Sequence, residues 1–302
     1  MITTILIILP LVAAILVYFA GQRLAPTIAI ASTLLEFAIA LYAYFNFEVL
    51  AGWNYVLVKD WIPSLGISYN VGMDGISLIL VILTSFLFPL ILLSTLTSSV
   101  KDKPSFYALA LVMQSALIGV FLAKDFFLFY IFWELALIPI YFICLMWGDV
   151  NRKFVTFKFF IYTLFGSLIM LAAIIYLYSV APEKSFALEN IYLTKLTSQE
   201  QVWIFGGLFL AFGIKMPIFP FHTWQPETYT SAPMAGTMLL SGIMLKMGVY
   251  GVIRWILPVL PNALMEWGWL ALLLSIIGIV YASIIAIKQS NFKTLIAYVS
   301  IA

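Results

Sequence analysis

Residues 211–224 read AFGIKMPIFPFHTW, an apolar helical stretch that two prolines interrupt. A proline has no backbone N–H group and its ring clashes with the carbonyl four residues back, so a helix must break near Pro217 and Pro220. Irregular backbone at membrane depth is tolerated only where protein or a water-filled cavity satisfies its polar groups. Lys215 therefore lies beside a break, and His222, the single histidine of the chain, follows it.

The composition indicates a polytopic membrane protein. Of 302 residues, 64% are hydrophobic and 9% are charged, whereas soluble domains are about 45–50% apolar and about 25% charged. A net charge of +2 is too small to suggest a nucleic-acid partner. The single cysteine excludes an internal disulfide and a cysteine-ligated cluster, and the single histidine excludes a bis-histidine haem. We therefore expect no redox cofactor in this chain.

Helices are predicted wherever about 20 apolar residues follow one another, because that length spans a bilayer. Two longer loops remain, at 46–74 and 181–200, and the first is predicted to be an extended or interfacial segment. Asp74 and Asp125 are placed to cap the helices that follow them. The chain ends inside its last helix, so we expect a truncated protein. The ten predicted helices cover approximately 2–20, 25–45, 75–97, 105–122, 125–147, 154–180, 201–217, 231–257, 267–287 and the residues from 292.

The distribution of charges between the loops predicts the orientation. Lysine and arginine outnumber acidic residues in the loops after the first, third, fifth and ninth helices, whereas acidic residues prevail in the loops after the second, fourth, sixth and eighth. Cytoplasmic loops carry the excess of basic residues. We therefore expect the N-terminus outside, the segment after Lys215 facing inward, and the chain in the inner (cytoplasmic) membrane of the cell.

Five charged residues remain once those assigned to the loops have been counted. A charge at the centre of a bilayer costs about 2.5–3.5 kcal/mol on insertion scales, so such residues face a partner or water and mark ion pathways by default. The isolated Glu36 on the second helix has no assigned role. The five residues are Glu36, Glu134, Lys215, Glu227 and Lys246.

Three of these charges have the residue types of a proton relay: one acid and two bases on three helices. Glu134 lies near the carbonyl that Pro139 frees, although it could instead be a protonated packing residue. Lys215 adjoins the break, although it could snorkel to the membrane surface. Lys246 lies among glycines and serine that let a neighbouring helix approach, although a static salt bridge is its alternative.

Two further residues are candidates to extend this relay, His222 and Glu227. Histidine titrates near neutral pH, which suits proton transfer. The alternative for His222 is a structural hydrogen bond in the unwound segment.

Five segments, in order along nearly the whole chain, resemble the antiporter-like membrane subunits of respiratory complex I. The segments at the seventh and eighth helices are also similar to Mrp-type sodium/proton antiporters, and the Phe-Trp-Glu segment selects the subunit type called chain M (chain 4 in mitochondria). The segments are GMDGISL at 72–78, FWELALIPIY at 132–141, KMPIFPFHTWQPE at 215–227, LLSGIMLKMGVYG at 239–251 and KQSNFKTLIAY at 288–298.

The resemblance implies an all-α fold of about fourteen membrane helices, of which about ten are present here. These would form N-terminal helices over 1–104, a first five-helix repeat over 105–257 and the start of an inverted second repeat over 258–302, all in one membrane domain. Inverted repeats with broken helices are a recurring transporter design. The sequence departs from the family pattern at Tyr229, where relatives often carry a second histidine. One residue that feeds protons into the relay is therefore expected to be altered, or its role moved to Glu227.

The resemblance also implies the function: proton translocation coupled to electron transfer from NADH to quinone, with Glu134, Lys215 and Lys246 as the relay. Catalytic, metal and cofactor-binding residues are not expected in this chain, because NADH, FMN, iron–sulfur clusters and quinone belong to partner subunits. The neighbouring antiporter-like chains L and N and the lipid bilayer are the expected partners. The alternatives are a subunit of an Mrp-type antiporter and a subunit of a hydrogenase- or ferredoxin-linked relative of complex I.

Overall fold

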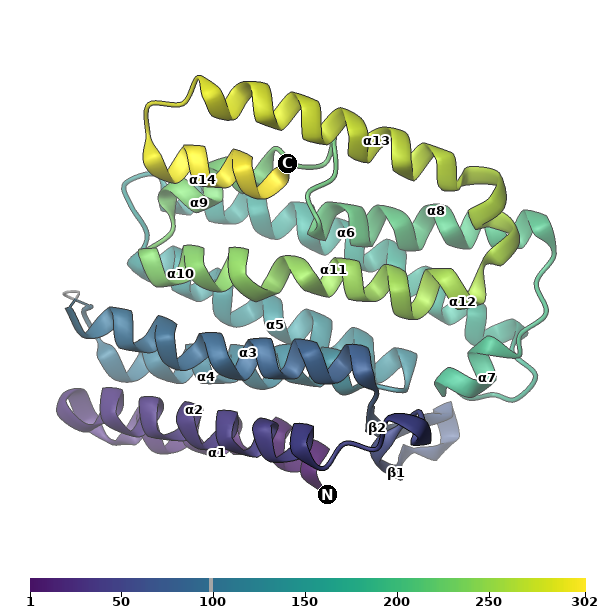
Figure 1. The fold of residues 1–302 in the computed structure, drawn as a ribbon, viewed down its shortest axis with the longest axis horizontal. Coiled ribbons are helices and arrows are strands. Elements are labelled where there is room, and N and C mark those ends of the chain that lie inside the picture. The colour runs from purple at the N-terminus through teal and green to yellow at the C-terminus, as the bar shows by residue number, and fades with distance from the viewer. Residues whose placement is uncertain (98–99) are drawn as a thin grey trace. The chain divides into compact units, whose positions relative to one another are not determined.

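The computed structural model describes residues 1–97 and 100–302, with elements labelled in Figure 1. Among these residues, eight helices are long and apolar enough to cross a membrane. The chain is therefore a multi-pass membrane protein, as its composition predicted. It divides into two compact units, residues 1–147 with 185–188, and residues 148–184 with 189–302.

The first unit is built on five long helices. Helix α4 is buried along most of its length, because it packs against α1, α2, α3 and α5. Gly119 on α4 permits the contact with α5: a Cβ atom there would lie 2.4 Å from the ring of Phe132. The helices are α1 Ile2–Phe19, α2 Gly21–Phe45, α3 Gly75–Ser94, α4 Lys103–Leu122 and α5 Phe126–Trp147.

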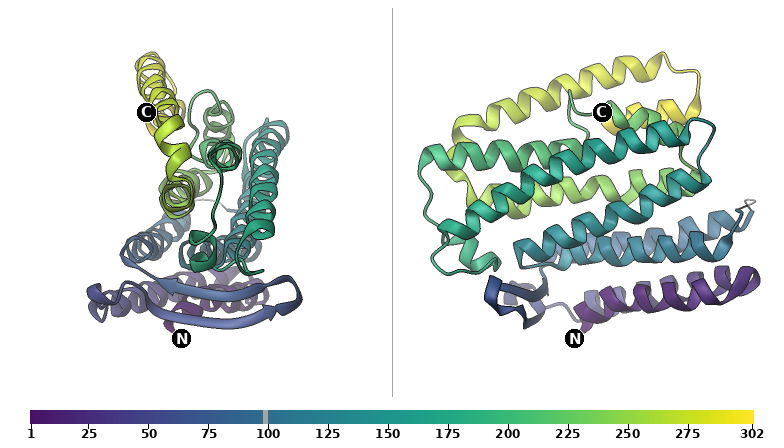
Figure 2. Two further views of the ribbon diagram at one scale, coloured as in Figure 1. Left: turned by 90° about the vertical axis from the view of Figure 1, so that its right-hand side faces the viewer. Right: turned by 180° about the vertical axis from the view of Figure 1, so that it is seen from behind.

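A β-hairpin lies at one end of these helices, and Figure 2 shows it as a long ribbon. Strands β1 Asn54–Ile62 and β2 Ile67–Met73 pair antiparallel. The sequence predicted only an extended or interfacial segment here, so the paired hairpin is a more specific structure than expected. The hairpin is tied to the α4–α5 connection, since the Lys124 N–H donates to the Asn70 carbonyl at 2.8 Å.

Two aspartates cap helices of the first unit, as predicted. The Asp74 carboxylate accepts from the Ser77 N–H at 2.9 Å. The Asp125 Oδ1 accepts from the second and third N–H groups of α5, both at 3.0 Å. Its Oδ2 accepts from the N–H and hydroxyl of Ser68 on β2, at 3.1 and 3.0 Å. Asp125 thus fixes the hairpin to the start of α5.

The second unit contains the proline-rich break. Its elements after α6 include two π-helical turns, Leu240–Met244 and Val252–Ile256, inside one continuous span from Met234 to Val259. The helices are α6 Arg152–Val180, α7 Leu188–Tyr192, α8 Ser198–Lys215, α9 Trp224–Ser231, α10 Met234–Leu239, α11 Leu245–Gly251, α12 Leu257–Val259, α13 Pro261–Ile287 and α14 Phe292–Ile301.

All ten predicted helices are present in the described residues, with shifts at some ends. The largest shift is at α13, which begins at Pro261 rather than near 267. The reason is that proline suits the first turn of a helix, where its missing N–H group has no intrahelical partner. The predicted division into N-terminal helices and two inverted repeats does not coincide with the two compact units and stays a prediction.

Asp125→Ala is expected to lower the free energy of unfolding by about 2 kcal/mol or more, because it removes a helix cap and a buried acceptor at once. Thermal unfolding of the full-length subunit in detergent measures this. Asp60→Ala, at an exposed aspartate on the hairpin, is the control and is expected to change little. Equal melting temperatures for Asp125→Ala and the unmodified subunit would contradict the capping role.

Candidate functional site

The predicted helix break is confirmed, because α8 ends at Lys215 and α9 begins at Trp224. Carbonyls at the end of α8 find donors around the break. The Met216 N–H donates to the Phe212 carbonyl at 2.8 Å, and the Ile218 N–H donates to the Gly213 carbonyl at 2.9 Å. The Trp224 indole Nε1 donates to the Ile214 carbonyl at 3.0 Å. The Met216 bond is the ordinary helical one. Because Pro217 has no N–H to give to the Gly213 carbonyl, the Ile218 N–H serves that carbonyl instead, and the Trp224 indole serves the Ile214 carbonyl in its place.

Lys215 is buried, with 2% of its surface exposed, and it forms the last residue of α8. Burial favours the neutral amine, whereas the C-terminal end of a helix carries a partial negative charge that favours the ammonium. These two influences oppose each other at the same side chain. Lys215 thus places an ionisable side chain at the end of a helix in the interior of the second unit.

Lys246 is half-buried on α11, close behind the first π-helical turn. Its Nζ donates to the carbonyl of Ser241, inside that turn, at 2.6 Å. A π-helical turn widens the backbone and such turns are frequent at functional sites. The turn thus supplies a polar backbone partner to a lysine that apolar residues flank on both sides.

Helix α11 packs directly on the break. A Cβ atom at Gly248 would lie 2.4 Å from the Met216 Cγ and 2.8 Å from the Phe212 carbonyl oxygen. A Cβ atom at Gly251 would lie 2.5 Å from the ring of Phe212. The prediction that small residues here let a neighbouring helix approach is confirmed. As a result, the segments that carry Lys215 and Lys246 are in direct contact.

His222 lies within the irregular segment and is 4% exposed. Its ring is 5.7 Å from that of Phe219 and 5.2 Å from that of Tyr281 on α13, measured between centroids. The histidine is therefore packed between two aromatic rings, in the irregular segment between α8 and α9. Tyr229, which the sequence analysis singled out, is fully buried on α9.

Glu227 has a different setting from the two lysines. It is exposed on α9, and its Oε1 accepts from Lys158 Nζ on α6 at 2.8 Å. Lys158 was not predicted as its partner, because the two residues are 69 positions apart and no local pattern connects them. The pair lies at the edge of this unit rather than in its interior.

Glu134 belongs to the first unit, where it is half-buried on α5. Helix α5 continues through Pro139 without a break. The structure therefore brings together the segments of Lys215 and Lys246, while the inclusion of Glu134 in one relay with them stays a prediction.

Residues 123–302 match the family model described as "NADH:quinone oxidoreductase/Mrp antiporter, TM". The chain belongs to this family. It is 39% identical over 316 residues to F(420)H(2) dehydrogenase subunit M of Methanosarcina mazei, covering 99% of this chain and 62% of the relative. It is 38% identical over 312 residues to NADH-quinone oxidoreductase subunit M of Rickettsia prowazekii, covering 100% of this chain and 63% of the relative.

A solved structure of this family shows the same fold. Respiratory complex I from Thermus thermophilus with bound NADH contains a chain that matches with a TM-score of 0.90 and 28% identity. The match covers 100% of this chain and 62% of that chain. This chain thus spans a little over three fifths of the length of the relatives it matches.

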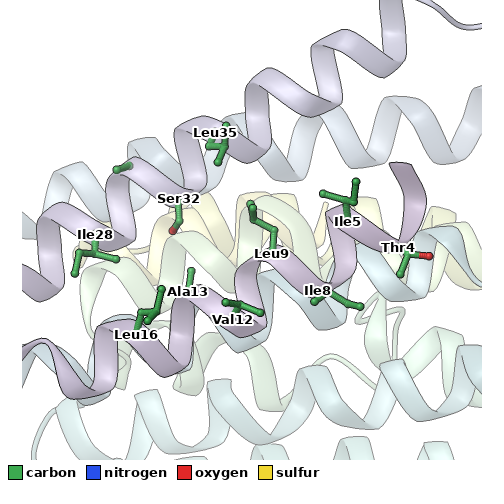
Figure 3. Close-up of a pocket in the computed structure, with 11 residues that line it drawn as sticks. Thr4, Ile5, Ile8, Leu9, Val12, Ala13, Leu16, Ile28, Ser32 and Leu35 are labelled. Atoms are coloured by element: carbon green, nitrogen blue, oxygen red, sulfur yellow. The ribbon is translucent and has the colours of Figure 1, made fainter. Parts of the chain in front are cut away.

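None of the candidate relay residues lines the open groove shown in Figure 3. This groove, about 610 Å³ in volume, lies between residues 4–16 of α1 and 28–35 of α2, and aliphatic side chains dominate its lining. The side chains that line it include no ionisable group. Within residues 1–97 and 100–302, no group of three histidine, cysteine, aspartate or glutamate side chains is placed to hold a metal ion.

Gly248→Ala is expected to reduce the free energy of unfolding by about 1–3 kcal/mol, because the new methyl group would collide with backbone at the break. Gly206→Ala on α8 is the matched control, since a Cβ atom there meets nothing within 4 Å. Melting temperatures of the two full-length variants, compared with the unmodified subunit, test the contact. A Gly248→Ala variant as stable as the control would show that α11 does not approach the break this closely.

Proposed function

We propose that this chain is a proton-translocating membrane subunit, of the chain M type, in an NADH:quinone oxidoreductase. The observation that carries the proposal is the direct contact between the break at Lys215 and the helix of Lys246. Two ionisable side chains on touching segments inside a membrane protein are a means of moving protons. The family match and the Thermus thermophilus complex support the assignment.

The first step of the proposed mechanism concerns Lys215. The end of α8 stabilises its ammonium form and burial stabilises its amine form. A change of charge nearby shifts this balance, because one pKa unit corresponds to only about 1.36 kcal/mol. Lys215 then takes up or releases a proton without a large rearrangement of the helices.

Lys246 is the next proton acceptor in this hypothesis. As an amine, its Nζ can accept a proton from the side of the break, and as an ammonium it is held by the carbonyl of Ser241. A lysine carries three donors when charged, so the carbonyl satisfies one of them and leaves the others for water. Water bridging between the two lysines would complete the path.

Glu134 completes the predicted relay as its acid. In the hypothesis its charge biases Lys215, and a signal from a neighbouring subunit changes that bias. His222, packed between aromatic rings beside the break, and Glu227, paired with Lys158, are the proposed extensions. The exposed position of Glu227 suits a role at the mouth of the path, where it would exchange protons with water.

The finer assignments follow from the same proposal. The chain lies in the inner membrane with its N-terminus outside, between the antiporter-like chains L and N. NADH, FMN, the iron–sulfur clusters and quinone are bound by other subunits, and this chain performs no electron transfer. Pro217 and Pro220 act by holding the break open, without a part in the chemistry.

A second candidate function keeps the channel and changes the source of energy. The relative from Methanosarcina mazei is named as a subunit of an F(420)H(2) dehydrogenase and matches as well as the NADH-linked relative. The description of the matched family also includes Mrp antiporters. NADH is therefore the first electron donor to test, and reduced F420 and ferredoxin are tested next. An antiporter would instead be recognised by the exchange of sodium for protons across the membrane.

Glu134→Gln is expected to abolish coupled turnover while leaving assembly intact, because glutamine keeps the size of the side chain but cannot carry the proton. The measurement uses inverted membrane vesicles that contain the full-length subunit in its complex. NADH-driven acidification and NADH:quinone reduction are followed together, after equal assembly has been confirmed. Both rates should fall at least tenfold.

Glu266→Gln is the control for that experiment, since Glu266 is an exposed glutamate on α13. It should retain both rates. Unchanged rates in Glu134→Gln would remove Glu134 from the relay. Vesicles that exchange sodium for protons but show no NADH-driven acidification would replace the oxidoreductase assignment with the antiporter.

Lys246→Met is expected to lower NADH-driven acidification by a similar factor, because methionine preserves the apolar packing of α11 and removes the proton acceptor. Lys195→Met, in the loop before α8, is the control and should leave acidification unchanged. Full proton pumping in Lys246→Met would exclude Lys246 from the path.

A further inference from the structure

A second buried carboxyl group lies outside the proposed relay, at Glu36 on α2. Its side chain is 0% exposed, and within residues 1–97 and 100–302 neither carboxyl oxygen has a hydrogen-bond partner. Glu36 belongs to the buried face of α2, which is otherwise formed by small residues. Ser32 and Leu35 on the same helix instead line the groove toward α1 (Figure 3). Glu36 is thus buried within the first unit and is not among the side chains that line this groove.

Two more polar side chains share this property on neighbouring helices. The Ser85 hydroxyl on α3 and both amide atoms of Gln114 on α4 are buried without a hydrogen-bond partner in the described part of the chain. Both residues are 0% exposed. Buried polar atoms in native proteins are almost always hydrogen-bonded to protein or to ordered water. Each of these three side chains on contacting helices therefore calls for a partner such as ordered water.

The contacts between the helices place these residues at one depth. Gln22 Oε1, near the start of α2, accepts from the Lys103 N–H at the start of α4 at 3.0 Å. With a rise of 1.5 Å per residue, Glu36 then lies roughly 21 Å and Gln114 roughly 17 Å from that end. The two residues are within about one helical turn of each other along the membrane normal.

Ser85 falls at the same level. The rings of Phe37 and Phe86, the residues that follow Glu36 and Ser85, are 5.6 Å apart between centroids. The C-terminal end of α3 is held next to the first turns of α4, because the hydroxyls of Thr95 and Tyr107 are hydrogen-bonded to each other.

Gln114 lies on the face of α4 that meets α3. It follows Tyr107 by seven residues, which is close to two turns of helix, so both side chains lie on one face. Tyr107 on that face is hydrogen-bonded to Thr95, the residue that directly follows α3. The three side chains thus converge from α2, α3 and α4 toward the space between these helices.

The ionisable residues on the surrounding helices indicate the protonation state of the Glu36 side chain. Helices α1 and α3 carry no acidic or basic residue. The basic residues of α2 and α4 are Arg23 and Lys103, both close to the end marked by Gln22 and so roughly 20 Å away along the helices. The remaining ionisable groups of these four helices are the tyrosines Tyr18, Tyr42, Tyr44 and Tyr107. On α5, packed against α4, Glu134 is acidic as well.

We propose that Glu36, Ser85 and Gln114 form a proton- and water-binding site in the membrane interior, separate from the lysine relay. Without a cation nearby, a carboxylate at this depth would be costly, so Glu36 holds its proton. Because these side chains make no direct hydrogen bond to one another, water bridges them: the acid O–H donates to a bound water molecule, which donates in turn to the Gln114 Oε1. The Gln114 Nε2 and the Ser85 hydroxyl donate to bound water as well, so that the water has the two or more polar partners it needs.

Infrared difference spectroscopy of the assembled complex, with the full-length subunit, tests the site directly. The carbonyl stretch of a protonated carboxyl group should be present in the unmodified subunit and lost in Glu36→Gln. It should shift in frequency in Gln114→Leu and in Ser85→Ala. Ser32→Ala is the matched control on α2, because its hydroxyl bonds the Ala29 carbonyl of its own helix and faces the groove. This variant should leave the band in place.

Exchange into D₂O decides whether water reaches the site. A hydrated Glu36 should show the isotope shift of its carboxyl band without unfolding. Identical spectra for Glu36→Gln and the unmodified subunit, or a band that never shifts in D₂O, would overturn the proposal. Loss of the band on adding sodium at constant pH would also overturn it, by showing that a metal cation rather than a proton occupies the carboxyl group.

Discussion

The arrangement of this protein depends on the requirement that a backbone carbonyl at membrane depth must find a donor. At the end of α8, prolines remove the donors that a continuous helix would supply. The N–H of Ile218 and the indole of Trp224 replace them. With these hydrogen bonds the backbone is irregular for the eight residues between α8 and α9, and Lys215 is the last helical residue before the break. The location of the buried charge is thus a consequence of backbone chemistry.

The π-helical turn at Leu240–Met244 is a second departure from regular helix, and the helix that follows it packs against the break. The π-helical turn before α11 provides the Ser241 carbonyl to Lys246, and Gly248 then allows α11 to touch the end of α8. Close packing of α11 on the end of α8 and the Ser241 carbonyl thus contribute to the positions of these lysines within the second unit. A site held by rigid backbone can keep its geometry while a side chain changes its charge, which a proton relay requires.

The sequence predicts most of the fold because the determining signals are local. The length of the apolar runs predicts the helices, and the two prolines predict the break. Asp74 and Asp125 predict where two of the helices begin. The β-hairpin was expected only as an extended or interfacial segment, since the pairing of Tyr69 with Lys59 depends on strand register rather than on composition. The π-helical turns and the Lys158–Glu227 pair also arise from tertiary contacts, and no local pattern marks them. Glu134 was singled out by its charge and by family resemblance, and these remain its support.

The charged residues in and near the membrane segments differ in how each is compensated, and this separates their functions. Glu227 is exposed and paired with Lys158, and an ion pair in contact with water contributes only about 0–1 kcal/mol to stability. Lys215 ends helix α8, and Lys246 donates a hydrogen bond to the carbonyl of Ser241. Glu36 has polar but uncharged neighbours on the helices around it, so its neutral form is the one that the surroundings stabilise. A carboxyl group that keeps its proton can organise internal water without adding charge to the membrane interior, whereas the proposed relay requires each lysine to exchange its proton.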